Sequence, residues 1–196
     1  MANTSTPTGR IMLNDVRLSF APGLFEPSVP KGSQPGTKPK YNCGIILSPD
    51  HPQLEAVRTK MKAVAQEKWG AKWEATYTAL EKQDKLALHD GDLKPNYDGY
   101  PGNFFLNPNS EESAPPTVID RDRTKLTARS GRPYAGCYVN ASIEIWAQDN
   151  TFGKRINAQL RGVQFLRDGD AFSSARPADV DEFGDVSDGS EADDIA

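Results

Sequence analysis

The segment YAGCYVNASIEIWAQDNTFGKRINAQLRGVQFLRDGD, residues 134–170, decides the fold. Apolar residues alternate with polar ones over residues 137–146 and again over residues 155–161. A period of two with one apolar face is typical of a half-buried strand. Residues 149–153, between the two runs, are of the types that favour turns. The segment therefore predicts a long β-hairpin.

Two changes of phase predict that the sheet is bent. The second run of the hairpin changes phase at Gly162, and a glycine at such a point indicates a β-bulge. The first strand, expected over residues 10–20, changes phase at residues 14–15 and places Phe20 in its inward phase. Bulges increase the local twist of a sheet. A sheet with two of them is expected to curl toward a barrel.

The rest of the chain predicts further strands and two helices. We expect a strand over residues 40–47, then a helix that opens at residues 48–50 and ends at Gly70. A second helix carries Trp73 and Tyr77 at helical spacing, which favours packing over ligand binding. Residues 89–133 read as a long loop with short strands near 103–106 and 117–119. The prediction is a mainly β protein with helices, that is, an α+β fold.

Composition and charge divide the chain into three parts. Residues 1–9 are rich in Thr, Ser and Pro and are expected to be disordered, residues 10–178 form the domain, and residues 179–196 form a disordered acidic tail. The tail contains eight of the 27 acidic residues and no basic one, which leaves 19 acids against 23 bases, or +4, in residues 1–178. A basic body with an acidic end is typical of nucleic-acid binders. The candidate partner-binding residues of the tail are Asp181, Glu182, Phe183, Asp185, Asp188, Glu191, Asp193 and Asp194.

Composition disfavours several other classes of protein. No apolar run reaches the roughly 18 residues of a membrane span, and the N-terminus lacks the pattern of a secretion signal. Cys43 and Cys137 lie within strand patterns, so we expect two buried, reduced thiols in a cytoplasmic protein. Phosphate loops and the common hydrolase and metalloprotease motifs do not occur. We therefore expect no catalytic residues, no metal and no cofactor.

Aromatic and cationic side chains are interleaved on the loops and on the polar strand faces. Binding of a flexible single strand needs this mixture, because cations contact phosphates while aromatic rings stack on any base. Duplex binding would more often use a helix in the major groove, and neither predicted helix has a strongly basic face. The aromatic candidates are Tyr41, Tyr97, Tyr100, Phe104, Tyr134 and Tyr138. The cationic candidates are Arg17, Lys38, Lys40, Arg121, Arg123, Arg132, Arg155 and Arg161.

Several segments resemble one phage protein family. They are VRLSF…LFEP, KPKYNCGIIL, KWG, DGD, YAGCYVNASIEIWA and LRGVQFLRDGDAF, spread over roughly residues 10–172. The family was long filed as a domain of unknown function and includes single-stranded DNA-binding proteins of tailed bacteriophages. The resemblance implies an OB-fold, a five-stranded and partly open barrel that binds single strands on one face and its loops. It also implies that the protein coats unwound DNA during phage replication, recombination and repair, in the cytoplasm of the infected host.

The tail is similar to the mobile acidic ends of bacterial and phage single-strand binders, which recruit other replication proteins. Those ends often finish on an aromatic residue, whereas this chain ends in Ile195 and Ala196 and has Phe183 as its only tail aromatic. Two alternatives stay open at this point. One is a protein–protein interaction module that uses the same polar face, and the other is a metal-dependent nuclease with Asp90, Asp92 and Asp120 as ligands.

Overall fold

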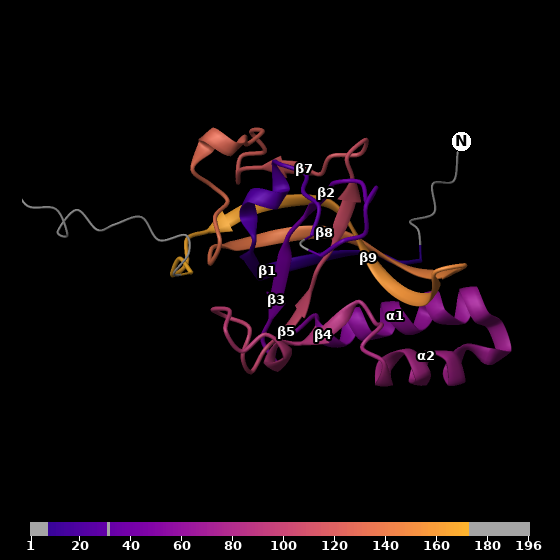
Figure 1. The fold of residues 1–196 in the computed structure, drawn as a ribbon. Helices are drawn as coiled ribbons and strands as arrows, with labels where there is room; N and C mark the ends of the chain where they lie inside the picture. Colours follow the sequence, from indigo (N-terminus) through magenta and orange to yellow (C-terminus); the bar gives the residue numbers. More distant parts are fainter. Residues whose placement is uncertain (1–7, 31, 173–196) are drawn as a thin grey trace, which may run out of the picture.

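The computed structural model describes residues 8–30 and 32–172 of the 196-residue chain (Figure 1). Its α-helices are α1 (Leu54–Trp69) and α2 (Trp73–Lys82). Its strands are β1 (Arg10–Ser19), β2 (Lys40–Asn42), β3 (Gly44–Leu47), β4 (Leu88–Asp90), β5 (Phe104–Leu106), β6 (Asn109–Glu111), β7 (Thr117–Ile119), β8 (Tyr138–Asn150) and β9 (Gly153–Arg167). Short 3₁₀ helices are η1 (Ala21–Leu24), η2 (Gly70–Lys72), η3 (Gly91–Leu93) and η4 (Ala128–Ser130). None of the helices in these residues is long and apolar enough to cross a membrane.

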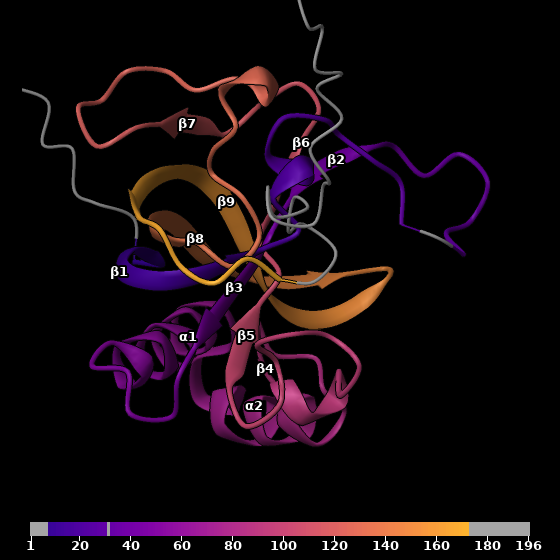
Figure 2. The same ribbon diagram turned by 90° about the vertical axis from the view of Figure 1, so that its left-hand side faces the viewer.

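The strands form one curved sheet in the order β2-β6-β9-β8-β1-β3-β5-β4, with β7 also paired to β9. Most neighbours are antiparallel, whereas β6 and β7 run parallel to β9. Figure 2 shows β7 and the long loop before β2 on opposite sides of the molecule. The two segments therefore border different parts of the sheet.

The predicted hairpin is confirmed as the centre of this sheet. Strands β8 and β9 pair along their whole length, and Asn150 pairs with Gly153, so that Thr151 and Phe152 form the turn. The inward residues of both strands are buried in the main core. The side chains of Cys43 and Cys137 are also buried and are free thiols, as expected. Burial raises the pKa of Cys43 to about 12 and that of Cys137 to about 11.

Both predicted bulges are present, and they lie on either side of β8. Leu13 pairs with Ala141 and Val16 with Val139, so two residues of β1 face only Asn140. On the other side, Ser142 pairs with Gly162 but Ile143 pairs with Leu160, which leaves Arg161 as the extra residue. The absence of a side chain at Gly162 lets β7 approach, because a Cβ atom there would lie 2.9 Å from the carbonyl oxygen of Thr117. The bulges bend β1 and β9 at the same level of the sheet.

The two helices lie side by side beneath the hairpin (Figure 1). Tyr77 is buried and its ring contacts Trp73 edge-on, which confirms that the aromatic residues of α2 serve packing. The predicted start of the first helix is wrong: α1 begins at Leu54, and residues 48–50 belong to the preceding turn. Gln53 is the N-cap residue, and its side chain bonds to β1 instead of capping the helix. It accepts a hydrogen bond from Asn14 N at 2.7 Å and donates one to Met12 O at 2.8 Å, which fixes the helix start to β1.

The chain forms more strands than the five expected, although the α+β class is confirmed. The segment predicted as one strand over residues 40–47 divides at Cys43, whose amide donates to the carbonyl of Pro108. Its first half pairs with β6 and its second half pairs with β1 and β5. The loop over residues 89–133 contains β5, β6 and β7, each of three residues. Short ladders of this kind satisfy the backbone groups of a long connection.

The described part of the chain begins within the segment expected to be disordered. Thr8 and Gly9 of that segment contact the domain: Lys60 donates to Thr8 O at 2.9 Å and the amide of Ile145 donates to Gly9 O at 2.9 Å. Residues 1–7 lie outside the described residues, and so does the predicted boundary between residues 178 and 179.

Candidate nucleic-acid interface

A groove of about 480 Å³ runs between the end of β1 and the loop before β2. Its wall on one side is the proline-rich loop, and on the other side the segments around Lys94 and β6. The lining residues are Phe20, Ser28, Pro30, Ser33, Thr37, Lys38, Lys40, Asn42, Cys43, Lys94, Asn107 and Asn109. Three lysines and an exposed aromatic ring thus meet polar uncharged side chains in one depression.

Phe20 belongs to this groove and not to the core. The chain leaves the sheet at Phe20 with φ 53° and ψ 41°, a left-handed conformation, and the side chain is 42% exposed. Its ring centroid lies 5.6 Å from that of Tyr97, which is itself 50% exposed. The alternation of β1 predicted an inward Phe20 and is wrong for this residue, because the pattern holds only while the strand continues. The sequence Ala21-Pro22-Gly23 that follows is the signal that could have placed the residue in a turn.

A compact loop over residues 91–103 holds Lys94 and Tyr97 beside Phe20. Gly91 donates to the carbonyl of Asn103 at 2.7 Å, and the carboxylate of Asp92 accepts from the amide of Gly102 at 2.8 Å. A Cβ atom on Gly91 would lie 1.9 Å from the carbonyl oxygen of Tyr100, so only glycine allows the two ends of the loop to approach so closely. The loop is therefore fixed by its own backbone.

The predicted residues Lys38, Lys40 and Tyr41, which precede β3 in the chain, lie in the groove or at its edge. Lys38 is exposed and forms no ion pair within the described part of the chain. The ammonium group of Lys40 pairs with Glu111 at 2.9 Å, which reduces the charge available to a ligand. Tyr41 is half-buried in β2 opposite Ser110. Sequence reasoning found these residues but missed Lys94, because one lysine in a polar loop has no distinguishing pattern.

Two of the predicted stacking residues require correction. Tyr100 is only 1% exposed, and its hydroxyl shares a hydrogen bond of 2.6 Å with Ser19, so its ring forms the floor beneath Tyr97 and cannot stack on a base. Burial raises the pKa of Tyr100 to about 12. Phe104 packs against the core on the helix side, with the guanidinium of Arg58 5.1 Å from its ring centroid. Neither ring faces the groove. The prediction failed for these two residues because strand alternation and loop position do not distinguish a buried ring beneath a surface from an exposed one.

The hairpin tip projects toward the same side as the loop before β2 (Figure 2). Phe152 in the turn is 89% exposed, and Arg155 next to the tip is exposed without an ion pair in the described residues. The hairpin is fixed to α1 by a hydrogen bond of 3.0 Å from the indole of Trp69 to Asp149. Arg155 is therefore an exposed cation of β9 close to the turn of the hairpin.

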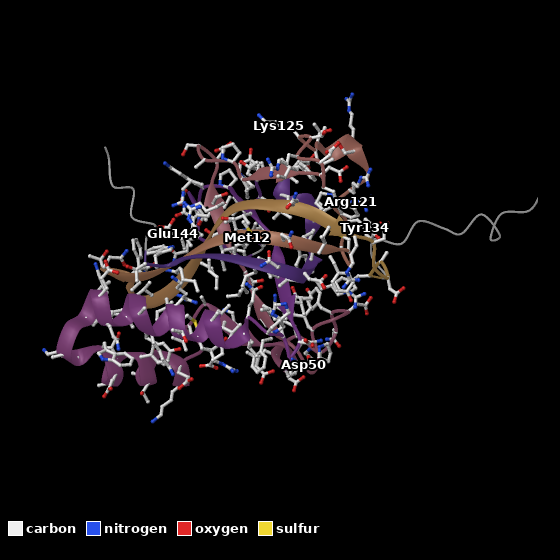
Figure 3. All side chains as sticks on the ribbon, turned by 180° about the vertical axis from the view of Figure 1, so that it is seen from behind. Met12, Asp50, Arg121, Lys125, Tyr134 and Glu144 are labelled. Carbon is white, nitrogen blue, oxygen red and sulfur yellow. The ribbon has the colours of Figure 1, made fainter. Side chains whose placement is uncertain are left out.

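Most of the other predicted residues have partners within the protein; Figure 3, a view from behind, labels Arg121, Tyr134 and Glu144. Arg161 binds Glu144 with both its Nε, at 3.0 Å, and a terminal nitrogen. Arg132 pairs with Asp120 at 3.2 Å. Arg17 donates to the carbonyl oxygens of Gly136 at 3.1 Å and Asp170 at 2.8 Å. These guanidinium groups are occupied by partners within the protein.

Two of the predicted tyrosines are likewise engaged. The hydroxyl of Tyr134 donates to Asp168 at 2.9 Å, and its ring packs against the core. Tyr138 lies beneath the guanidinium of Arg167, 3.5 Å from the ring centroid. Arg121 and Arg123, in the turn after β7, are exposed. What distinguishes the groove is the exposed ring of Phe20 together with Lys38, which forms no ion pair in the described residues.

Comparison of the sequence with known protein families assigns the chain to one of them. Residues 9–196 match the family described as Enterobacter phage Enc34, ssDNA-binding protein. The chain belongs to this family. The predicted resemblance is thereby confirmed. A relative, protein p50 of Acyrthosiphon pisum secondary endosymbiont phage 1, is 44% identical over 181 residues, which cover 91% of this chain and 94% of that protein.

Solved structures of the Enc34 protein have the same fold. A C-terminally truncated single-stranded DNA-binding protein from bacteriophage Enc34 is 26% identical, with a TM-score of 0.67 over 85% of this chain and 90% of that one. The same phage protein in complex with ssDNA is 24% identical, with a TM-score of 0.67 over 84% of this chain and 90% of that one. The OB-like α+β assignment is confirmed by this likeness.

The carboxylates of the nuclease alternative do not come together in this member of the Enc34 family. Asp90 and Asp92 accept backbone hydrogen bonds from Asp92 and Gly102, respectively, at the start of the 91–103 loop. Asp120 lies at the end of β7 and pairs with Arg132. Within residues 8–30 and 32–172, no three His, Cys, Asp or Glu side chains are grouped as a metal site would require. The residues of the acidic tail, Asp181 to Asp194, lie outside the described part of the chain.

Proposed function

We propose that the protein binds single-stranded DNA, largely without regard to sequence, along the groove between β1 and the loop before β2. The observation that carries the proposal is the groove itself, which Phe20 and Lys38 line and beside which the exposed ring of Tyr97 lies 5.6 Å from that of Phe20. Membership of the Enc34 family, which is described as ssDNA-binding, supports the same ligand. In this proposal the two rings stack on bases, and Lys38 and Arg155 contact phosphates.

The geometry favours a single strand over a duplex. Stacking on Phe20 and Tyr97 needs bases that are free of a neighbouring base on one face, which a single strand provides. The stacking energy of roughly 1–3 kcal/mol per base is nearly independent of base identity. A duplex is most often read by a helix in the major groove, whereas α1 and α2 are packed beneath the hairpin.

The proposed role is non-catalytic. The protein would protect unwound DNA during phage replication, recombination and repair, in the cytoplasm of the infected bacterium. Its acidic tail would compete with DNA for the basic body, since eight acids follow a body of charge +4, and would recruit partner proteins through the segment that holds Phe183. The arrangement of one domain over residues 10–178 with a tail over residues 179–196 belongs to this proposal.

One titration separates this function from the alternatives. The full-length protein is mixed with labelled oligo-dT and with a duplex of equal length, with and without Mg²⁺, over a series of salt concentrations. We expect salt-sensitive binding of the single strand without cleavage, with log K falling by about 0.7 per log unit of salt for each phosphate contacted. An absence of binding would favour a protein–protein module, and cleavage that requires Mg²⁺ would favour a nuclease.

A further inference from the structure

Aromatic rings enclose the ammonium group of Lys94. Its Nζ lies 4.6 Å from the ring centroid of Phe105 and 4.9 Å from that of Tyr100, both of which are buried. It lies 5.5 Å from the centroid of Phe20 and 5.8 Å from that of Tyr97, both of which are exposed. All four distances fall within the roughly 6 Å at which a cation is attracted to a ring face. One charge thus contacts the floor and the rim of the groove together.

This lysine differs from the other cations of the groove. Lys40 has a carboxylate partner, whereas no acidic side chain in the described residues forms an ion pair with Lys94. Burial lowers the pKa of Lys94, because the rings replace water around its charged end. A lysine that serves as a phosphate contact normally extends its ammonium group into solvent, as the exposed Lys38 can. The ammonium group of Lys94 is instead directed at the rings.

We propose that Lys94 is a positioning residue that holds Phe20 and Tyr97 in the orientation for base stacking, rather than a contact to phosphate. The inference rests on the proposed function. The two exposed rings are tilted by 59° to each other, and each contacts the buried ring of Tyr100, at centroid distances of 6.4 Å for Phe20 and 6.0 Å for Tyr97. A cation shared with the buried Tyr100 and Phe105 fixes both rings to the floor of the groove. Bases then meet a surface that is already ordered, which lowers the entropic cost of binding.

The test compares Lys94→Met with Lys38→Met. Methionine is unbranched like lysine and only one atom shorter, and it packs well against aromatic rings, but it has no charge. Each variant is titrated with oligo-dT and with an abasic oligonucleotide of equal length over a salt series. We expect Lys94→Met to weaken oligo-dT binding by about 3- to 10-fold, with an unchanged salt slope and unchanged affinity for the abasic strand. The control Lys38→Met should reduce the salt slope by about 0.7 and weaken binding of both strands.

Other results would overturn the inference. If Lys94→Met lowers the salt slope and weakens abasic binding, Lys94 is a phosphate contact. If it leaves oligo-dT binding unchanged, the charge does not position the rings. Lys94→Arg should restore most of the lost affinity, because a guanidinium also stacks on aromatic faces, and urea denaturation of each variant shows whether the fold is intact. Failure of the wild-type protein to bind oligo-dT would overturn the proposed function and this inference together. If the wild type binds oligo-dT and Lys38→Met behaves as expected, an unexpected result for Lys94→Met overturns only the role of Lys94.

Discussion

The hydroxyl oxygen of Ser19 lies 2.6 Å from the hydroxyl oxygen of Tyr100, and both residues are buried. Ser19 is the last residue of β1, and Tyr100 belongs to the loop over residues 91–103. Their hydrogen bond therefore connects the sheet to the loop directly beneath Phe20. The position of the groove floor relative to the sheet depends on this contact.

Replacing Tyr100 by Phe should destabilise the fold without changing its shape. The Ser19 hydroxyl would be buried without its partner, at a cost of about 1–3 kcal/mol in the free energy of unfolding. Urea denaturation measures the change. Tyr97→Phe is the matched control, since Tyr97 is exposed, and should change the free energy by less than about 0.5 kcal/mol. Equal effects of the two substitutions would contradict the assignment of Tyr100 to the floor.

Alkaline pH should destabilise the protein well before ordinary lysines lose their charge. Burial raises the pKa of Cys43 from 9.0 to about 12 and that of Tyr100 from 10.0 to about 12. In this window the unfolded chain releases protons that the folded chain retains, so stability is complete below 9.0 and falls as pH rises toward 12. Each group lowers the free energy of unfolding by up to about 1.4 kcal/mol per pH unit. Urea denaturation across this range should show a shallower decline for Cys43→Ala than for the wild type, and a flat profile for the wild type would refute the prediction.

Removing either exposed ring of the groove should weaken single-strand binding. Phe20→Ala and Tyr97→Ala should each cost about 1–3 kcal/mol in affinity for oligo-dT, because one stacked base loses its platform. Fluorescence anisotropy of a labelled oligonucleotide measures the change, and the salt slope should stay the same. Trp146→Ala is the control, since Trp146 is 42% exposed but lines a different pocket. A loss of affinity in the control as large as in the groove variants would place the strand elsewhere.

A single methyl group at Gly91 should disturb the loop that carries Tyr97. The added Cβ would lie 1.9 Å from the backbone oxygen of Tyr100 and 2.5 Å from that of Asn103. Because backbone atoms must move to make room, Gly91→Ala should lower the free energy of unfolding by about 1–3 kcal/mol and weaken oligo-dT binding. Asn96→Ala, at an exposed position of the same loop, is the control for both measurements. If the two variants behave alike, the close approach at Gly91 does not fix the loop.

Truncation after Ala178 should tighten DNA binding, chiefly at low salt. The removed segment holds eight acids and no base, and its attraction to a basic body is screened as ionic strength rises. Oligo-dT affinities of the full-length and truncated proteins should therefore converge as salt is added. Equal affinities at every salt concentration would show that the tail does not compete with DNA.

Local pattern was sufficient for the hairpin and its bulges. Strand β8 is buried on alternate residues over residues 138–145, and the phase changes at residues 14–15 and at Gly162 mark real changes of register. These features depend only on neighbours in sequence and on one buried face. The three-residue strands β4 and β6 were not predictable in this way, because each is stabilised by partners distant in sequence.

The site was harder to predict than the sheet because exposure and pairing are tertiary properties. Arg161 and Arg132 carry the same charge as Lys38, but their partners, Glu144 and Asp120, become neighbours only in the folded chain. Tyr100 and Tyr97 are three residues apart in one loop, yet one is buried and the other is exposed. Residue type indicated the kind of chemistry, whereas the exposure and the ion-pair partner of each residue became visible only in the structure.

The left-handed conformation of Phe20 places stability and binding in opposition at one position. A bulky side chain with positive φ is strained by an amount on the order of 1–3 kcal/mol, and glycine would remove that strain at no steric cost. The same change would remove the ring that faces the groove. Selection for a more stable fold and selection for a better stacking surface therefore act in opposite directions on this residue. In the proposed function, this strain falls on the surface that binds DNA.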